Sequence, residues 1–231
     1  MPTNGSNSPY SNGPASEQIG HIRETLLMMA SLADRNLSLA MRSLVERDEK
    51  LADSVEAEDS QLDELEVSID ELVINHMATH APVATDCRFM LVASKISSNL
   101  ERIGDQAVAI VRRTRELNKE PLLKPLIDIP RMAQIAEGML RDGITAFVDR
   151  KAELAQEIIK RDKEVDIINK QLARELTSFM LEDPATITRA LNLMIVARCL
   201  ERVADHCKNI GEEVYYLYQA KDIRHERTPA A

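Results

Sequence analysis

The sequence has few of the residues that interrupt helices. Among its 231 residues are seven glycines and nine prolines, and the prolines are confined to a few places. No proline falls within residues 15–81, 83–120, 131–183 or 185–228. Because proline inside a helix costs about 3 kcal/mol, long helices can run through these spans. Aromatic residues make up only 3% and tryptophan is absent. This composition predicts an all-α protein.

Other absences narrow the function. The net charge of −9 disfavours nucleic acid as a partner, because proteins that bind nucleic acid usually need a basic surface to contact its phosphates. No apolar run approaches the roughly 18 residues of a membrane span, and no signal-peptide core precedes the first predicted helix, so we expect no direct membrane insertion. The three cysteines (Cys87, Cys199 and Cys207) lack CxxC spacing. They are typical of free thiols in a reducing cytoplasm.

The most informative pattern is an internal repeat. The apolar positions of residues 96–117 return one hundred residues later in 196–217, with the 4-3-4-3 spacing of a helix that packs along its length. Each copy contains one short signature, ERIGD at 101–105 and ERVAD at 201–205. Self-similarity of this kind indicates two homologous structural units.

The repeat extends beyond the signatures. Leu51 and Asp59 correspond to Leu154 and Asp162 at an offset of 103, which shrinks to 100 after the prolines at 82 and 184. We therefore predict six long helices in two tandem three-helix bundles, side by side and related by a pseudo-two-fold axis. The predicted organisation is a disordered tail at 1–16, a first repeat at 17–118, a proline-rich linker at 119–130, a second repeat at 131–221 and a C-terminal tail at 222–231.

Each signature places two carboxylates one helical turn apart. Glu101 and Asp105, like Glu201 and Asp205, stand at i and i+4, offset by about 40° around the helix. Each lies roughly 160° from the central apolar residue of its copy, so we expect both to point away from the core. One interpretation is a solvated polar face on which Arg102 and Arg202 act as counter-ions. The recurrence of the pair equally favours a functional site.

The preceding helix of each half carries a further acidic pair, Asp59 with Asp63 and Asp162 with Asp166. These residues flank the apolar stripe and could turn toward the signature carboxylates. Four carboxylates from two helices would suit Mg²⁺, Ca²⁺, Mn²⁺ or iron, and would suit structural zinc poorly. The alternative is that these acids are ordinary charged flank residues.

Two other metal patterns have less support. His76 and His80 share a helical face, but Met77 stands where a zinc protease has glutamate, and histidines in a last helical turn are favoured by the helix dipole alone. A di-iron carboxylate enzyme would carry Glu-x-x-His. None of the residues three places before a histidine is glutamate: they are Gln18, Val73, Met77, Val203 and Asp222. The Glu-x-x-His motif is therefore absent, which disfavours this enzyme class.

The doubled signature, Asn209-Ile210 after the second copy and Asp86-Cys87-Arg88 before the first resemble the PhoU family of bacterial phosphate-signalling regulators. The resemblance covers about residues 17–224. It implies a cytoplasmic, non-enzymatic negative regulator of the phosphate-starvation response. It also implies an adapter between the ATPase subunit of a phosphate ABC transporter and a sensor histidine kinase, and a homodimer is the expected assembly.

In this family the E/D-x-x-x-D motifs bind metal ions, in some members as multinuclear iron clusters on the bundle surface. By position those motifs are Glu101/Asp105 and Glu201/Asp205, with Asn209 as a further oxygen ligand. Two departures are visible: Ala204 replaces the glycine of the first copy, and Ala109 stands where the second copy has Asn209. The first site is therefore expected to have one oxygen ligand fewer.

Two functional hypotheses remain open. The first is a signalling adapter whose polar faces, including Arg102 and Arg202, bind partner proteins while metal adjusts shape or charge. The second is a helical-bundle metalloenzyme with a carboxylate-bridged di-metal centre, which a buried location of the acids would favour. In both, metal ions are the expected cofactors, and the identity of the metal (iron, manganese, magnesium or zinc) is left open.

Overall fold

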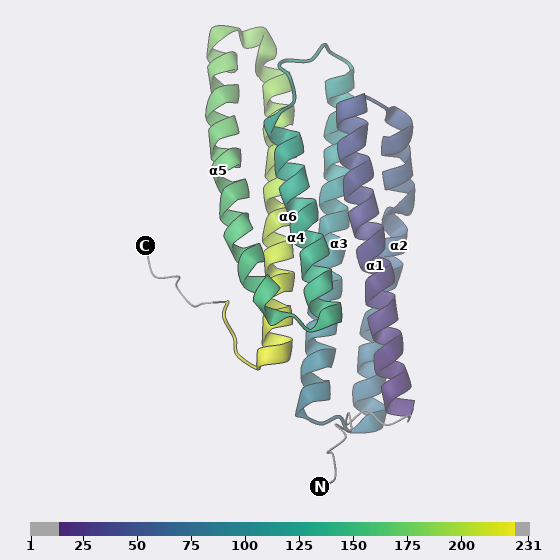
Figure 1. Ribbon diagram of the computed structural model, residues 1–231. Helices are drawn as coiled ribbons and strands as arrows, with labels where there is room; N and C mark the ends of the chain where they lie inside the picture. The colour runs from purple at the N-terminus through teal and green to yellow at the C-terminus, as the bar shows by residue number, and fades with distance from the viewer. Residues whose placement is uncertain (1–13, 225–231) are drawn as a thin grey trace, which may run out of the picture.

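The computed structural model describes residues 14–224, and all the regular structure in that part of the chain is helical. These residues form six long helices, labelled α1 to α6 in Figure 1, and one 3₁₀ turn. In chain order they are α1 (Pro14–Glu46), α2 (Glu49–His80), α3 (Ala84–Asn118), α4 (Asp128–Asp149), α5 (Ala152–Glu182), the 3₁₀ turn η1 (Pro184–Thr186) and α6 (Ile187–Gln219). The predicted all-α class with six helices is confirmed.

The prolines set several of the boundaries, as expected. Pro82 follows the left-handed residue that ends α2, and Pro184 opens the 3₁₀ turn before α6. Pro130 lies in the first turn of α4, where a missing N–H removes no helical hydrogen bond. The helix can therefore include Pro130, and α4 begins at Asp128, within the region predicted as a linker (119–130).

The first helix also begins earlier than predicted. It starts at Pro14, so residues 14–16 belong to α1 and the prediction of a disordered tail over 1–16 was wrong for them. Proline is well suited to the first position of a helix. The rest of that predicted tail, residues 1–13, lies outside the described residues, as do residues 225–231 of the C-terminal one.

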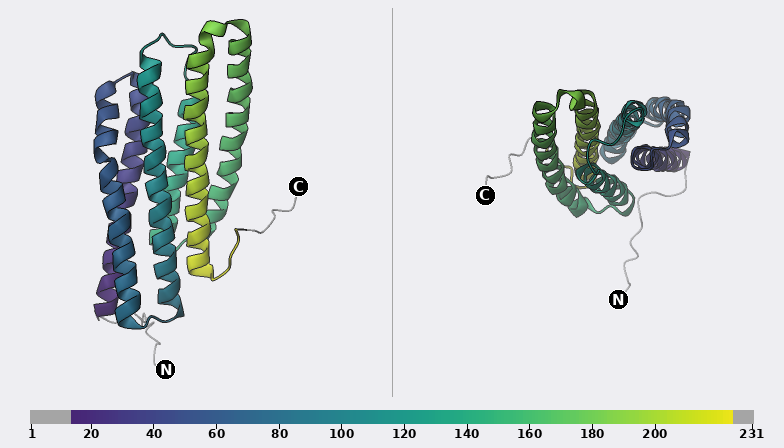
Figure 2. Two further views of the ribbon diagram at one scale, coloured as in Figure 1. Left: turned by 180° about the vertical axis from the view of Figure 1, so that it is seen from behind. Right: turned by 90° about the horizontal axis from the view of Figure 1, so that it is seen from above.

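The helices form two three-helix bundles placed side by side (Figures 1 and 2). Helices α1, α2 and α3 all contact one another, and so do α4, α5 and α6. The two bundles meet mainly where α3 packs against α6, with a smaller contact between α1 and α4. Ile103 and Val203, at the centres of the two signatures, are completely buried, as predicted. Buried apolar residues of both bundles form one continuous core.

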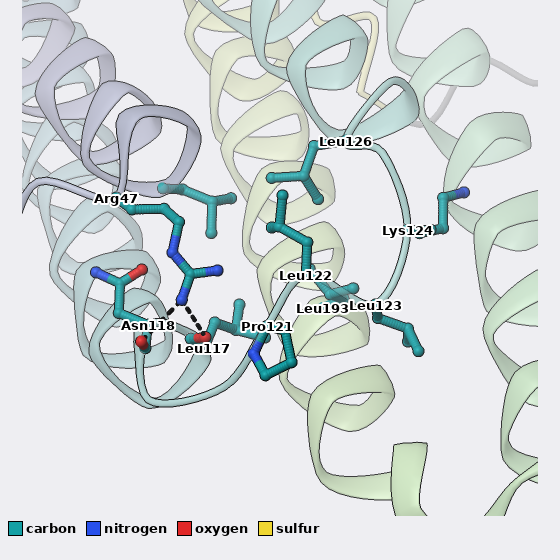
Figure 3. Close-up of a pocket in the computed structure, with 10 residues that line it drawn as sticks. Arg47, Leu117, Asn118, Pro121, Leu122, Leu123, Lys124, Leu126 and Leu193 are labelled. Atoms are coloured by element: carbon teal, nitrogen blue, oxygen red, sulfur yellow. Dashed lines mark hydrogen bonds between the residues drawn. The ribbon is translucent and has the colours of Figure 1, made fainter.

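The linker between the bundles is held by Arg47, which follows α1 in a left-handed conformation with φ of 57°. Its guanidinium donates hydrogen bonds to the carbonyl oxygens of Leu117, Asn118 and Glu120, at 3.3, 2.8 and 2.7 Å. Figure 3 shows this side chain reaching toward the end of α3 beside Pro121. A basic side chain thus satisfies carbonyl groups that a helix end leaves without partners.

The signature glycine of the first half matters for packing. A Cβ added to Gly104 would lie 2.3 Å from Cδ1 of Leu62, a residue buried in α2. The corresponding pair in the second half is the smaller Val165 and the larger Ala204, both buried. The exchange of glycine for alanine between the two copies therefore accompanies an opposite change in size on the neighbouring helix.

This reciprocity predicts that the effect of Gly104→Ala depends on residue 62. In the natural chain we expect the free energy of unfolding to fall by about 1 kcal/mol, because overpacking exceeds the gain in helix propensity. In a Leu62→Val background the same substitution should instead stabilise the protein. Denaturant unfolding of the four variants measures both effects. An equal effect of Gly104→Ala in the two backgrounds would show that Leu62 does not limit the packing.

Candidate functional site

The candidate site is built around the antiparallel contact of α3 with α6. Arg88 Nη1 donates to the carbonyl oxygen of Leu217 at 3.4 Å, and Lys95 Nζ lies 2.9 Å from Glu213 Oε1. Further along, Asn99 Oδ1 lies 3.0 Å from His206 Nδ1. Because α3 and α6 repeat one another at an offset of 100, this register places Arg102 beside its own counterpart at 202. The two signatures therefore meet at the pseudo-two-fold axis.

The first signature faces the acids of α2, and we call Asp59, Asp63, Glu101 and Asp105 the first acidic patch. Asp63 acts electrostatically on Glu101, and Asp105 acts on Asp59, which shows that the two pairs face each other. Arg102 joins the signature carboxylates: its Nε lies 3.3 Å from Glu101 and its Nη1 lies 3.2 Å from Asp105.

The prediction that both signature acids point away from the core needs correction. The Asp105 side chain is 46% exposed, but that of Glu101 is only 16% exposed. In the second half Asp205 is 53% exposed and Glu201 is 16% exposed. The reason is that α2 and α5 pack close beside the signature face and cover the glutamate, which a calculation on a single helix does not include.

Burial and the acidic neighbours change the titration of these groups. Burial, followed by the charge of Asp105, raises the pKa of Glu101 from its ordinary value of 4.5 to about 7, although Arg102 acts against this rise. Burial and then the charge of Asp63 raise the pKa of Asp59. Arg112 acts in the opposite direction on Asp59. The first acidic patch therefore has four carboxylates and two nearby arginines, Arg102 and Arg112.

The second acidic patch consists of Asp162, Asp166, Glu201 and Asp205, and it contains its own cation. Lys208 Nζ lies 3.0 Å from Asp162 Oδ2 and 4.0 Å from Asp205 Oδ1. Burial acts to lower the pKa of Lys208, but the hydrogen bond and charge of Asp162 outweigh it, so the pKa is raised. Arg198 Nε adds a contact of 3.5 Å to Glu201.

The two patches therefore differ in how their charge is balanced. The positions of Lys208 and Arg198 are occupied by Val108 and Ser98 in the first half. Helical spacing alone places both cations on the same face as Glu201 and Asp205, but only Arg202 was predicted as a counter-ion there. The signal was available, because both are departures between otherwise matching copies, but only the structure shows that both cations contact the patch.

The side chains of Arg202 and Asn209 lie in a groove between α3 and α6, which Arg102 and His206 also line. Asn209 Nδ2 donates to Asn99 Oδ1 at 3.3 Å, so the asparagine predicted as a metal ligand is engaged by α3. Arg202 makes no ion pair within residues 14–224, since Arg198 and Lys208 already contact the acids of its own signature.

The histidine pair lies elsewhere. His76 is buried and its Nδ1 lies 3.1 Å from Gln18 Oε1, while its ring stacks on His80 at a centroid distance of 4.9 Å. Burial, and then the charge of His80, lower the pKa of His76. This environment is that of a satisfied core histidine at the end of α2.

The acidic patches have the donor chemistry of a hard-metal site without its final geometry. Across residues 14–224, no three His, Cys, Asp or Glu side chains converge closely enough to hold a metal ion as they stand. Glu201 Oε2 is nevertheless buried without a hydrogen bond.

Fold and site together define a class: two-repeat helical bundle proteins that present paired acidic patches. The model of the PhoU domain matches this chain twice, at residues 26–114 and 129–214. The chain belongs to the PhoU family. The double match agrees with the two predicted repeats.

Relatives and solved structures extend this result over most of the chain. The phosphate-specific transport system accessory protein PhoU homolog of Pseudomonas putida is 35% identical over 209 residues, covering 90% of this chain and 82% of the relative. PhoU of Escherichia coli K12 is 32% identical, covering 93% and 89%. The crystal structure of PhoU from Pseudomonas aeruginosa superposes with a TM-score of 0.87 at 33% identity, covering 89% and 99%. Within the described residues, no helix is long and apolar enough to cross a bilayer.

The raised pKa of Glu101 predicts a pH-dependent stability. A carboxyl group whose pKa is higher in the folded than in the unfolded state makes the folded protein less stable as the pH rises. For Glu101 this loss falls between the unfolded pKa of about 4.5 and the folded pKa of about 7. We therefore expect Glu101→Gln to stabilise the metal-free protein at pH 8 relative to the natural chain, and to have little effect at pH 4. Thermal unfolding with a chelator present measures this. A difference in melting temperature between the variants that stays constant over this pH range would contradict the assignment.

Proposed function

We propose that this protein is a negative regulator of phosphate uptake and of the phosphate-starvation response. The coarser part, an accessory and regulatory role in phosphate transport, rests on relatives that match over at least 90% of the chain and are named for a phosphate-specific transport system. The finer part is that the protein acts in the cytoplasm as a non-enzymatic adapter. Its partners would be the ATPase subunit of a phosphate ABC transporter and a sensor histidine kinase.

The single observation that carries the adapter hypothesis is the matched pair of signature arginines at the pseudo-two-fold axis. Arg202 is exposed and makes no ion pair within residues 14–224, and Arg102 is exposed beside the same groove. An exposed guanidinium without a carboxylate partner is suited to pair with an acidic group on another protein. A homodimer is the assembly we expect for this adapter.

We also propose that the acidic patches bind metal ions. The carboxylates Glu101, Asp105, Asp59 and Asp63 would provide the ligands in the first patch, and Glu201, Asp205, Asp162 and Asp166 in the second. A bound cation would supply positive charge that relieves repulsion among these groups. Burial, and then neighbouring acids, raise the pKa of Glu101 in the first patch and of Asp205 in the second, and burial also raises the pKa of Glu201. In the second patch the ammonium group of Lys208 already supplies part of this positive charge.

A helical-bundle metalloenzyme is the second candidate. It is favoured by one observation, the low exposure of the Glu101 and Glu201 side chains, since catalytic di-metal centres lie inside bundles. The aspartates of both signatures are about half exposed, which fits a surface site better. The family match to regulatory accessory proteins also supports the adapter.

The charge difference between the patches predicts unequal metal binding. Asp105→Asn should remove more bound metal per mole of protein than Asp205→Asn, and the double variant should lose the most. Lys208→Gln should increase the metal bound by the second patch, because it removes the competing cation. Elemental analysis after equilibration with iron, manganese, magnesium or zinc measures each. Unchanged metal content in the double variant would refute the assignment of the ligands.

The adapter hypothesis predicts a regulatory phenotype. Deletion of the gene should leave phosphate-starvation genes expressed when phosphate is plentiful, and Arg102→Glu with Arg202→Glu should have the same effect while circular dichroism stays helical. The matched control is Arg174→Glu, an exposed arginine of α5 outside the groove. Normal repression in the deletion strain, or enzyme-like turnover of a phosphorylated substrate, would contradict the hypothesis.

A further inference from the structure

A second polar pocket lies far from the acidic patches, where four helix ends meet. It has a volume of about 510 Å³ and is formed by the beginnings of α1 and α3, the residue after α4 and the end of α6. We call it the arginine pocket, because Arg23, Arg88 and Arg150 line it with a single acid, Asp86. In a chain of net charge −9, a pocket with three arginines and one carboxylate is unusual.

None of the three arginines pairs with a carboxylate within residues 14–224. Aromatic rings hold two of them instead. The Arg23 guanidinium lies 5.4 Å from the ring centre of Phe89 and 5.3 Å from that of Phe147, and Arg88 lies 5.7 Å from the ring centre of Tyr216. Stacking fixes the plane of a guanidinium without removing its charge, and of these two side chains Arg88 also donates from Nη1 to the carbonyl oxygen of Leu217. These side chains are therefore oriented without being neutralised.

Arg150 gives the sharpest contrast, because the repeat supplies its counterpart. Arg47 and Arg150 occupy matching positions after α1 and α4, and both are left-handed, with φ of 57° and 60°. Arg47 donates to three carbonyl oxygens at the end of α3. Arg150 donates no such bonds, and Arg88 contacts the carbonyl oxygen of Leu217 instead. One arginine of the pair closes a helix end, and the other lines the pocket.

The acid and the helix ends do not cancel this charge. Asp86 makes no ion pair in the described part of the chain, and its charge acts partly on His76, whose pKa burial and His80 lower. Helices α1 and α3 begin at this pocket whereas α4 and α6 end there, so the helix dipoles oppose one another and the positive charge of the pocket comes from the arginines. At the opposite end of the described bundles, the matching space beside Arg47 and Leu117 is lined by linker residues 121–124 and has a volume of only about 10 Å³. Helix α1 has 33 residues and α4 has 22, so the first eleven residues of α1, including Arg23, have no counterpart.

We propose that the arginine pocket binds a phosphate-class oxyanion, either free inorganic phosphate or the phosphate group of a small ester. Arg23, Arg88 and Arg150 would donate hydrogen bonds from three sides, and bidentate geometry is what a guanidinium offers to phosphate oxygens. The volume lies within the range of small-molecule sites, about 300–1,000 Å³, and Phe89 and Leu217 provide an apolar wall. This anion site is separate from the proposed adapter role. Only the choice of phosphate among oxyanions rests on the proposed function in phosphate transport.

The test is isothermal titration calorimetry of the full chain with inorganic phosphate and, separately, with adenosine monophosphate, at constant ionic strength set with chloride. We expect saturable binding of at least one ligand. Arg88→Gln with Arg150→Gln should weaken it by about tenfold or more, because each substitution removes charge-assisted hydrogen bonds to the anion. The control Arg174→Gln removes one positive charge outside the pocket, as each pocket substitution does inside it. This variant should bind the ligand like the natural chain.

If the double variant misfolds, Arg150→Gln alone provides the test. It should fold normally, because the exposed side chain of Arg150 donates no hydrogen bond in the described structure. Tighter binding of phosphate would identify the free ion as the ligand, and tighter binding of the nucleotide would identify an ester. Absence of saturable binding of both, or equal affinity in the pocket variants and the control, would overturn the proposal. Reporter expression separates this result from the adapter role: a variant that loses binding and still represses leaves the adapter role intact, whereas a deletion strain that represses normally rejects the adapter role regardless of binding.

Discussion

The antiparallel packing of α3 against α6 is the contact on which the rest of the molecule depends. Each of these helices is the third of its bundle, so their apolar seams serve the bundle and the junction together. The antiparallel register brings the two signatures to the same level, with Arg102 and Arg202 at the pseudo-two-fold axis. Helix α2 packs on α3 and helix α5 packs on α6, and the acidic patches form where these pairs meet.

Repulsion among the carboxylates of each patch is destabilising, and the two halves compensate it with different cations. The first half leaves Glu101 partly covered and repelled by its neighbours, with only Arg102 to compensate. The second half places Lys208 between Asp162 and Asp205 and adds Arg198 at Glu201. Duplicated units often share one backbone while their side chains diverge. Here the divergence changes the electrostatic character of two geometrically equivalent sites.

A second asymmetry comes from helix length. Because α1 extends beyond α4, one end of the molecule has additional helical surface on which the arginine pocket is built. The acidic patches and the arginine pocket thus lie on different parts of the same bundle pair and carry opposite charge. A regulator with both could respond to a cation and to an anion independently, which is consistent with a role in phosphate transport.

The helical class, the duplication and the burial of Ile103 and Val203 could be predicted from the amino-acid sequence. Proline placement and apolar spacing are local properties, and in a helix they directly define the packed face. The sequence also pointed to Glu101 and Glu201, but their low exposure depends on the neighbouring helix. The contact of Lys208 with Asp162 and the convergence of Arg23, Arg88 and Arg150 could not be predicted in this way, because both depend on how the helices pack. These residues lie far apart in the chain, and only the packing of six helices brings their charged groups within reach of one another.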